Sequence, residues 1–459
     1  MTARANGSRM SREEIRASLS LGSIFGLRMM GLFLILPVFA VHAPELRGGD
    51  NLALVGLAMG AYGLTQAILQ IPYGIAADRY GRKRVIAFGL VLFAAGSFLA
   101  AASQDIWLTI LARSVQGAGA ISAAVMALAA DLTREEHRTK TMAVIGASIG
   151  LVFALSLVAA PALYRWIGMA GIFALTGILA VAAIWVLYQV VPPEPELKSH
   201  AGADLSDATL GRILGNGELT RLYLGTFILS FAQMSMFVVF PRALTSEGGI
   251  PVDEHWKVYL PVVLASFVLM LPPILSAERK GKAKRVFIGS ILLIVAVQFA
   301  LAFGNHTLVL LVVALLAFFV GFNVLEASIP SLVSRIAPAV AKATALGVYN
   351  TTLSFGLFAG GAVGGWLAQH YGAVALFLAN AALMLGWAAV AASMRVPPPV
   401  SSRTFSLPER FDPVALRGAL LRVTGVRDAT ILPEEGVAHL KVMPGWDEAG
   451  AMRLLQPQG

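Results

Sequence analysis

The stretch Gly74-Ile75-Ala76-Ala77-Asp78-Arg79-Tyr80-Gly81-Arg82-Lys83-Arg84, called the signature segment below, decides the fold of this chain. It places a dense cluster of charge between two long apolar runs. Its terminal glycines permit two helices and a loop to approach closely. Asp78 and Arg82 are four residues apart, the spacing of an ion pair on one helical turn. A simple positive anchor loop would explain the basic residues of the segment but not its glycines or its aspartate.

The composition excludes several protein classes. The chain is 57% hydrophobic and 13% charged over 459 residues, with a mean hydropathy of +0.74, which is not the composition of a soluble globular protein. It has no cysteine, so disulfides, thiolate metal sites and cysteine nucleophiles are excluded. The net charge of +9 does not indicate nucleic-acid binding, because the basic residues fall in short segments between apolar runs. No enzyme motif is present.

Apolar stretches of about 20 residues, each long enough to cross a bilayer, recur along the chain. We predict twelve transmembrane helices, at roughly 17–43, 52–77, 84–103, 106–131, 139–163, 170–191, 218–243, 256–277, 285–303, 306–336, 340–369 and 372–394. Lys and Arg concentrate in the segments that lie on the same side of the membrane as the N-terminus. The opposite segments hold only Arg47, Arg165, Arg242 and Lys257. This asymmetry places both termini in the cytoplasm.

The predicted domain organisation is two six-helix bundles, at 1–191 and 218–395, joined by a cytoplasmic linker at 192–217. A degenerate copy of the signature segment recurs between the second and third spans of the second set, with the sequence Glu278-Arg279-Lys280-Gly281-Lys282-Ala283-Lys284-Arg285. Two such repeats indicate bundles related by an axis along the membrane normal, with a binding site between them near the midplane.

The last segment, 400–459, is polar and is predicted to form a small cytoplasmic α+β domain in the order β-α-β-β-α. Strands are expected at 405–407, 426–432 and 437–443. Asp412 and Asp447 are suited to cap the two helices. This order resembles a ferredoxin-like domain of the heavy-metal-associated type. The metal-binding version needs two cysteines, so no metal site is expected here.

Three charges lie within predicted spans, where a charge is costly and usually functional. They are Arg28 in the first span, Arg113 in the fourth and Glu326 in the tenth. Asn323 shares a helix face with Glu326. Two interpretations remain open: a static ion pair between Arg28 and Glu326, or a proton carried by Glu326 with its affinity modulated by Arg28.

Asp131, at the end of the fourth span, is expected at the same membrane depth as Asp78 and Arg82. It belongs either to a solvated charge cluster or to a charge network with the signature segment. In the seventh span, Met234, Met236 and Phe237 could form a pliable apolar wall, although simple core packing explains them equally well.

The signature segment resembles the loop between the second and third helices of major facilitator superfamily transporters. Arg113, with Gln116-Gly117-Ala118-Gly119-Ala120, resembles the fourth-helix motif of that superfamily, and a packing role is expected for its glycines. A more specific resemblance, beyond the superfamily, is to YajR-type transporters. It rests on Leu27-Arg28-Met29, Tyr62-Gly63-Leu64-Thr65-Gln66-Ala67, Asp131-Leu132-Thr133-Arg134-Glu135, His255-Trp256-Lys257-Val258-Tyr259-Leu260 and the small C-terminal domain.

The resemblance implies a transporter of the proton-driven drug efflux branch in the bacterial inner membrane, whose first, fourth, seventh and tenth helices line a central cavity. The leading hypothesis is a proton-coupled antiporter that exports small amphipathic compounds by alternating access. It would be a monomer that uses the proton gradient and no cofactor, with the lipid bilayer, protons and a small-molecule substrate as its partners and no nucleic acid.

Two alternatives are an exporter or symporter of a specific metabolite such as a sugar, and a membrane sensor that signals through the C-terminal domain. Hydrogen-bonding groups for a metabolite could come from Gln66, Gln70, Gln233, Asn323 and Asn350. The candidate proton-coupling and cavity residues are Glu326, Arg28, Arg113, Asn323 and Gln233. The candidate gating residues are Gly74, Asp78, Arg79, Gly81, Arg82 and Asp131.

Overall fold

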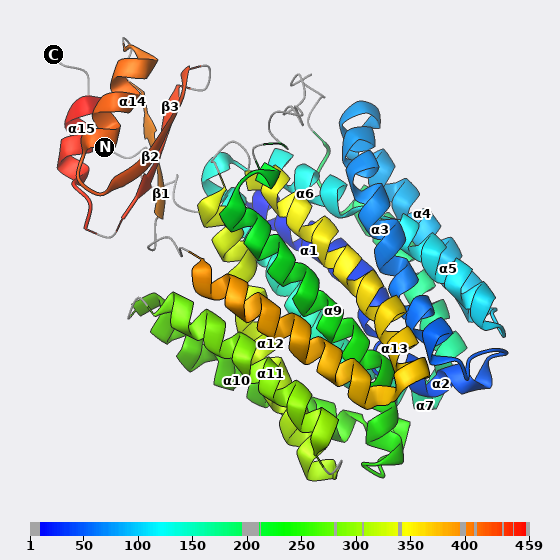
Figure 1. Cartoon of the computed structure of the whole chain (residues 1–459). Coiled ribbons are helices and arrows are strands. Elements are labelled where there is room, and N and C mark those ends of the chain that lie inside the picture. Colours follow the sequence, from blue (N-terminus) through cyan, green and yellow to red (C-terminus); the bar gives the residue numbers. More distant parts are fainter. Residues whose placement is uncertain are drawn as a thin grey trace.

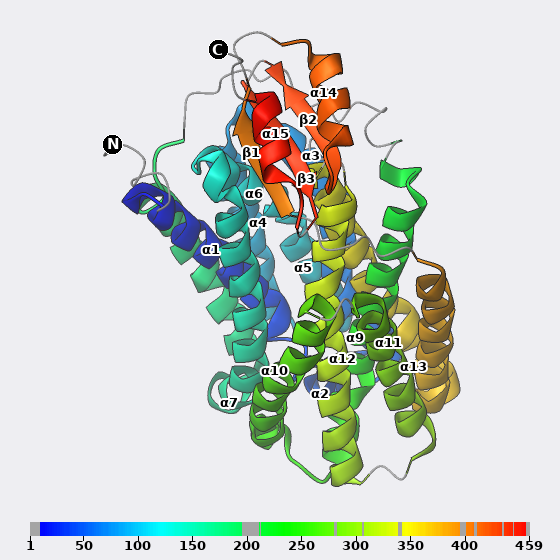
Figure 2. The same ribbon diagram turned by 90° about the vertical axis from the view of Figure 1, so that its left-hand side faces the viewer.

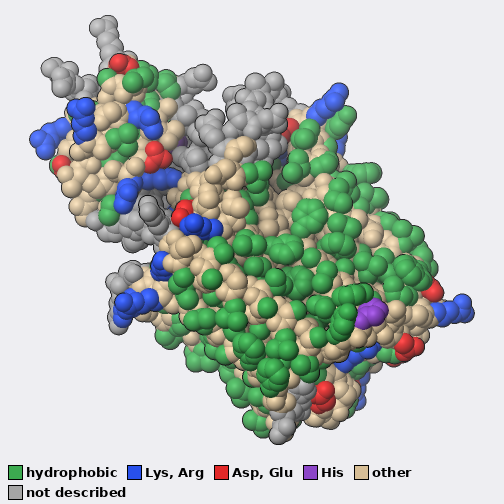
Figure 3. Space-filling view, viewed as in Figure 1, with side chains coloured by type: hydrophobic (Ala, Val, Ile, Leu, Met, Phe, Trp, Pro, Cys, Tyr) green, Lys and Arg blue, Asp and Glu red, His purple; other side chains and the backbone are tan. Residues whose placement is uncertain are grey.

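The computed structural model shows a bundle of long helices with a small α/β domain at one end (Figures 1 and 2). The structure describes residues 10–194, 211, 213–279, 282–304, 307–337, 342–394, 401–407, 411–433, 436–443 and 445–455. Within these ranges, nine helical segments are long and apolar enough to cross a membrane. Hydrophobic side chains cover most of the visible side of the bundle, while Lys and Arg gather towards its ends and on the small domain (Figure 3). The mainly helical membrane architecture expected from the composition is confirmed.

The helices before the linker are α1 (Arg12–Phe33), α2 (Phe39–His42), the 3-10 turn η1 (Ala43–Glu45), α3 (Leu52–Tyr80), α4 (Arg82–Ala101), α5 (Ile106–Ala118), α6 (Ser122–Asp131) and α7 (Glu135–Gln189). Those after it are α9 (Gly217–Ser246), the 3-10 turn η2 (Val252–Glu254), α10 (Trp256–Arg279), α11 (Ala283–Phe303), α12 (Leu308–Ile336) and α13 (Lys342–Ser393).

Two predicted spans are not single helices. In the first span, expected at 17–43, the helix stops at Phe33 and is followed by turns up to Val38. Pro37 explains this break, because it has no N–H to donate to the Phe33 carbonyl and its ring clashes with that carbonyl. The fourth, expected at 106–131, divides into α5 and α6 around Gly119, whose backbone is not helical (φ −73°, ψ 51°).

Two long helices each cover a pair of predicted spans. Inside α7, Gly168 has a non-helical backbone with φ 63°, and inside α13, Gly372 has φ 81°. These positive φ values are tolerated by glycine at no steric cost. Gly168 falls between the predicted spans 139–163 and 170–191, and Gly372 is the first residue of the predicted span 372–394, so both bends lie within a few residues of the predicted connections.

Glycines bring α3 and α13 into direct backbone contact. A Cβ atom on Gly56 would lie 2.1 Å from the Gly361 carbonyl oxygen, and one on Gly60 would lie 2.7 Å from that of Phe358. Small residues allow this separation between membrane helices. The contact joins segments on opposite sides of the linker.

The C-terminal domain contains β1 (Ser401–Ser406), α14 (Pro413–Arg422), β2 (Val426–Leu432), β3 (Val437–Val442) and α15 (Glu448–Leu455). Its antiparallel sheet has the order β1-β3-β2. The predicted β-α-β-β-α order is confirmed, except that the first strand begins at Ser401 rather than 405. Residues 408–410, 434–435 and 444 lie outside the described ranges.

Alternating side chains explain how this sheet is covered. Ala438, Leu440 and Val442 of β3 are buried in one cluster with Leu420 of α14 and Leu455 of α15. Lys441 points to the other face, where its Nζ donates to the carbonyl oxygens of Ala337 (2.6 Å) and Arg335 (3.3 Å). The sheet therefore contacts the C-terminal end of α12, where a positive charge is favourable.

Candidate transport site and gating cluster

Arg28 is fully buried in α1, with 1% of its surface exposed. Its Nη1 donates to Ser122 Oγ (3.1 Å) and its Nη2 to Gln66 Oε1 (3.0 Å). The guanidinium carbon lies 5.5 Å from the centre of the Tyr62 ring. The arginine therefore connects α1 to α3 and α6 through neutral groups.

Arg113 in α5 is equally buried and approaches the same Tyr62 ring, at 5.0 Å. Its Nη1 donates to Gln116 Oε1 (2.6 Å) and, at 3.5 Å, to the Gly31 carbonyl of α1. A Cβ on Gly117 would lie 2.1 Å from the Tyr62 carbonyl oxygen. The fourth-helix motif thus holds α5 directly against α3, which agrees with the packing role expected for its glycines.

The two arginines bring two positive charges into the apolar core without an acidic partner among the described residues. Burying an ion costs several kcal/mol even after relaxation. A neutral hydrogen bond returns about 1 kcal/mol and a cation–π contact about 0.5–2 kcal/mol. The neutral partners therefore offset only part of the cost, which marks this region as a functional site rather than ordinary packing.

Glu326 lies in α12, and its Oε1 accepts a hydrogen bond from the Tyr349 hydroxyl of α13 at 3.2 Å. Asn323, one turn away, donates to Ser266 Oγ of α10 at 3.1 Å. The structure does not bring Arg28 and Glu326 together, and no ion pair joins them in the described part of the chain. Tyr349 and Ser266 were not among the sequence candidates, because no local sequence pattern shows that a hydroxyl on one helix will bond to a polar side chain on a different helix.

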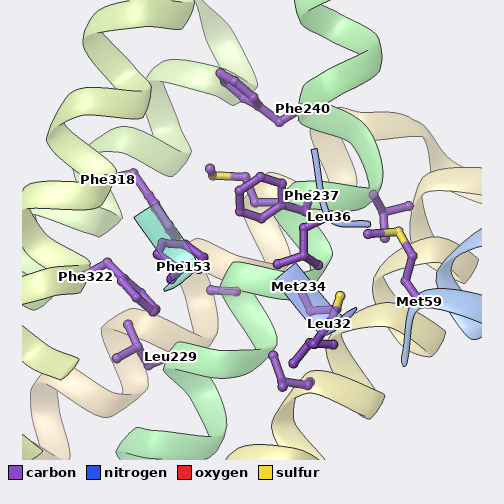
Figure 4. Close-up of a cluster of buried hydrophobic side chains, with 14 of the residues drawn as sticks. Leu32, Leu36, Met59, Phe153, Leu229, Met234, Phe237, Phe240, Phe318 and Phe322 are labelled. Atoms are coloured by element: carbon purple, nitrogen blue, oxygen red, sulfur yellow. The ribbon is translucent and has the colours of Figure 1, made fainter. Parts of the chain in front are cut away.

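Gln233 is buried in α9 beside a large apolar cluster. Met234, Met236 and Phe237 are all at most 1% exposed, so they are core residues in this structure. Figure 4 shows the cluster, to which α1, α3, α7, α9 and α12 all contribute. Its labelled members are Leu32, Leu36, Met59, Phe153, Leu229, Met234, Phe237, Phe240, Phe318 and Phe322.

The signature segment forms a charge network with α6. Arg82 contacts Asp78 through Nη1 (2.5 Å) and Asp131 through Nε (2.6 Å). The alternative of a charge network at Asp131 is therefore the arrangement found. Arg79 is exposed, and its guanidinium lies over the adjacent Tyr80 ring at 5.5 Å.

The two glycines of the signature segment differ. Gly81 is the break between α3 and α4, with φ 97°, and a Cβ there would lie 2.9 Å from Glu194 Oε1. At Gly74, by contrast, a Cβ would make only an ordinary contact, 3.7 Å from the Ala123 Cβ. The helices therefore meet at Gly74, but their separation there leaves room for a Cβ atom and does not require glycine.

An ion pair that the sequence reasoning missed, between a buried glutamate and a half-exposed arginine, joins α1 to the α6–α7 connection. Glu14 is 4% exposed and accepts hydrogen bonds from the backbone N–H of Ser11 (2.7 Å) and Arg134 (3.0 Å). The Arg134 guanidinium donates to both of its carboxylate oxygens at 3.0 Å. These bonds lower the pKa of Glu14 to about 2. The capping box Ser11-Arg12-Glu13-Glu14 was the available sequence signal.

Three contacts tie the segments before and after the linker at the end of the bundle away from the C-terminal domain (Figure 1). Arg242 Nε donates to the Ala40 carbonyl at 2.6 Å. The Leu52 N–H donates to Gln369 Oε1 at 2.7 Å, and the ion pair Arg165–Asp253 spans 3.5 Å. The two parts of the chain are thus fastened together at this end.

A family model described as "Major Facilitator Superfamily" matches residues 21–277 and 262–428. The chain belongs to the major facilitator superfamily. This membership agrees with the signature segment and the fourth-helix motif, and it identifies the protein as a membrane transporter, which is not an enzyme class.

Relatives and solved structures are consistent with this assignment. The chain is 41% identical to the inner membrane transport protein YajR of Escherichia coli K12, over 95% of this chain and 96% of that protein, so the predicted YajR-type resemblance is confirmed. It is 27% identical to the multidrug resistance protein MdtH of Proteus mirabilis, over 74% and 84% of the two chains. The fold is similar to that of a bacterial homologue of the lysosomal transporter Spinster in an inward-facing, occupied conformation, with a TM-score of 0.67, 14% identity and coverage of 83% and 96%.

Proposed function

We propose that this protein is a proton-coupled antiporter that exports small amphipathic compounds across the bacterial inner membrane by alternating access. The resemblance to an inner membrane transport protein and to a multidrug resistance protein supports the location and the substrate class. The observation that carries the proton coupling is the environment of Glu326.

A charge at the centre of a membrane helix costs from about 2.5 to over 10 kcal/mol. The carboxyl group of Glu326 has one neutral hydrogen-bond donor, the Tyr349 hydroxyl, and no cationic partner in the described residues. Binding a proton removes the charge and hence most of this cost. Hydration of the site in another conformation would favour release of that proton. Glu326 is therefore suited to carry a proton through the transport cycle.

The proposed architecture has twelve spans in two six-helix units, at 1–191 and 218–395. α1 supplies the first span, and α7 and α13 each supply two by bending at Gly168 and Gly372. The linker at 192–217 and the domain at 400–459 lie in the cytoplasm with both termini. The protein acts as a monomer, and the proton gradient, rather than a cofactor, supplies the energy.

Gating is assigned to the two ends of the bundle. Contacts such as Arg242 with the Ala40 carbonyl hold the halves together at the end that we assign to the periplasm. At the cytoplasmic end, the network of Asp78, Arg82 and Asp131 fixes the junction of α3, α4 and α6. Breaking the contacts between the halves at one end of the bundle while forming such contacts at the other end would alternate access to the site between the halves.

The test is transport by purified protein reconstituted into liposomes with an imposed pH gradient. Two fluorescent amphipathic compounds, cationic ethidium and anionic carboxyfluorescein, serve as probes. Glu326→Gln keeps the shape of the side chain but cannot release a proton, so pH-driven transport should be lost while substrate exchange persists. Glu254→Gln, which removes an exposed carboxylate paired with Lys257, is the control. Unchanged pH-driven transport by the Glu326→Gln variant would refute the proposal.

A second candidate is an exporter or symporter of a specific polar metabolite such as a sugar. It is favoured by the burial of two amide side chains, Gln66 and Gln70, on one face of α3. Transport of a sugar but of neither amphipathic probe would support this candidate. A sensor function has less support, because the chain belongs to a family of transporters.

A further inference from the structure

Buried polar atoms without hydrogen-bond partners occur on Arg28 and along the face of α3 that binds it. In the described part of the chain they include Arg28 Nε, the hydroxyls of Tyr62 and Tyr73, and Gln70 Oε1. Tyr62, Gln70 and Tyr73 lie on one face of α3 with Gln66, which binds Arg28 directly. Arg28 also interacts electrostatically with the Tyr73 hydroxyl. Orphaned polar groups are rare in native proteins, so a cluster of them calls for a functional explanation.

Three of these four groups are hydrogen-bond donors: the Arg28 guanidinium and the two tyrosine hydroxyls. The guanidinium fork matches a carboxylate in geometry and charge, and charge-assisted bonds of this kind are stronger than neutral ones. The nearby Arg113 adds a second positive charge over the same Tyr62 ring. The local chemistry therefore selects an anion over a cation or a neutral polar molecule.

An apolar surface begins one helical turn from this cluster. Leu32 follows Arg28 by four residues on α1, and Met59 precedes Tyr62 by three residues on α3. Both belong to the buried cluster that also contains Phe153. A molecule with a charged head at Arg28 would thus have its apolar tail next to the residues shown in Figure 4.

We propose that Arg28 binds the carboxylate of an amphipathic anion, so that the transported substrates are organic acids. This inference rests on the proposed transport function and adds the charge class of its substrate. Arg28 donates to the carboxylate through Nε, and the Tyr73 hydroxyl, with which Arg28 interacts electrostatically, supplies a further donor. Proton coupling at Glu326 and anion binding at Arg28 are then separate tasks of the two halves.

The experiment measures ligand-induced thermal stabilisation of the purified full-length protein in a neutral maltoside detergent. The probes are octanoate, octylammonium and octanol, which share an eight-carbon chain and differ in charge. Octanoate should raise the melting temperature in a saturable way, and the other two should not. Arg28→Gln should weaken octanoate binding by about tenfold or more, the loss expected for a charge-assisted contact. Arg285→Gln, which removes an exposed arginine, should leave it unchanged.

Two further variants keep the test decisive if Arg28→Gln does not fold. Arg28→Lys keeps the positive charge but loses the planar guanidinium group. Tyr73→Phe removes one hydroxyl that lacks a hydrogen-bond partner. Each variant should weaken octanoate binding without abolishing that binding. Binding is measured without a pH gradient, so the result does not depend on proton coupling, and the liposome assay tests the proton-coupling proposal separately. Equal stabilisation by octylammonium, octanoate binding that survives in every Arg28 and Tyr73 variant, or no response to octanoate would overturn the inference.

Discussion

Replacement of Glu14 by Gln should measurably destabilise the bundle. The pKa of Glu14 falls from 4.5 to about 2, mainly because the Arg134 guanidinium donates to its carboxylate. A difference of about 2.5 units corresponds to about 3.4 kcal/mol at 1.36 kcal/mol per unit. The Arg134 side chain is 50% exposed, so water screens part of this interaction. We therefore expect a loss of about 1–2 kcal/mol in the free energy of unfolding at pH 7.

The pH dependence of this loss has a defined sign. Because folding lowers the pKa of Glu14, its contribution is fully present above pH 4.5 and is lost as the pH falls through about 2. The stability difference between the native protein and Glu14→Gln should therefore be constant near neutral pH and shrink between pH 4.5 and 2.

The assay is thermal unfolding in detergent, followed for a double-mutant cycle of Glu14→Gln and Arg134→Gln. The coupling between the two substitutions should be favourable and exceed about 0.5 kcal/mol. Glu13→Gln, an exposed carboxylate in the same turn of α1, is the matched control and should have little effect. Strictly additive effects, or equal destabilisation by Glu13→Gln, would show that the ion pair does not hold α1 in place.

Three further predictions concern gating, packing and the C-terminal domain. Asp78→Asn removes the exposed ion pair with Arg82 at the cytoplasmic end, so it should shift the population towards the inward-open state by up to about fivefold. Cytoplasmic labelling of a cysteine placed at Asn323 should then increase, and equal labelling would contradict this prediction. Gly56→Ala should destabilise by about 1–3 kcal/mol because its Cβ has no space, whereas Gly289→Ala, with nothing within 4 Å, should not. Truncation after Pro399 should leave an inserted, transport-competent protein with an altered rate, and a folded but inactive product would assign the domain to the transport mechanism itself.

The sequence by itself determined the elements that depend on local physics. Spans such as 285–303 follow from hydropathy, because a bilayer requires a long apolar helix. The order of the C-terminal domain follows from the caps at Asp412 and Asp447 and from period-2 alternation. The charges Arg28, Arg113 and Glu326 within predicted spans could be recognised because charge is costly at membrane depth. Family membership followed from the signature segment.

Tertiary structure alone decided which partners these residues have. Arg28 and Glu326 suggested an ion pair, yet each found neutral partners instead, Gln66 with Ser122 and Tyr349 respectively. A hydrogen bond depends on ångström-scale distances between helices, and those distances are set by close contacts such as Gly117 against the Tyr62 carbonyl, far apart in sequence. Hydropathy records how deep a residue lies in the membrane, whereas helix packing determines what it faces. The set of polar atoms without hydrogen-bond partners on Arg28 and α3 is for that reason visible only in the folded protein.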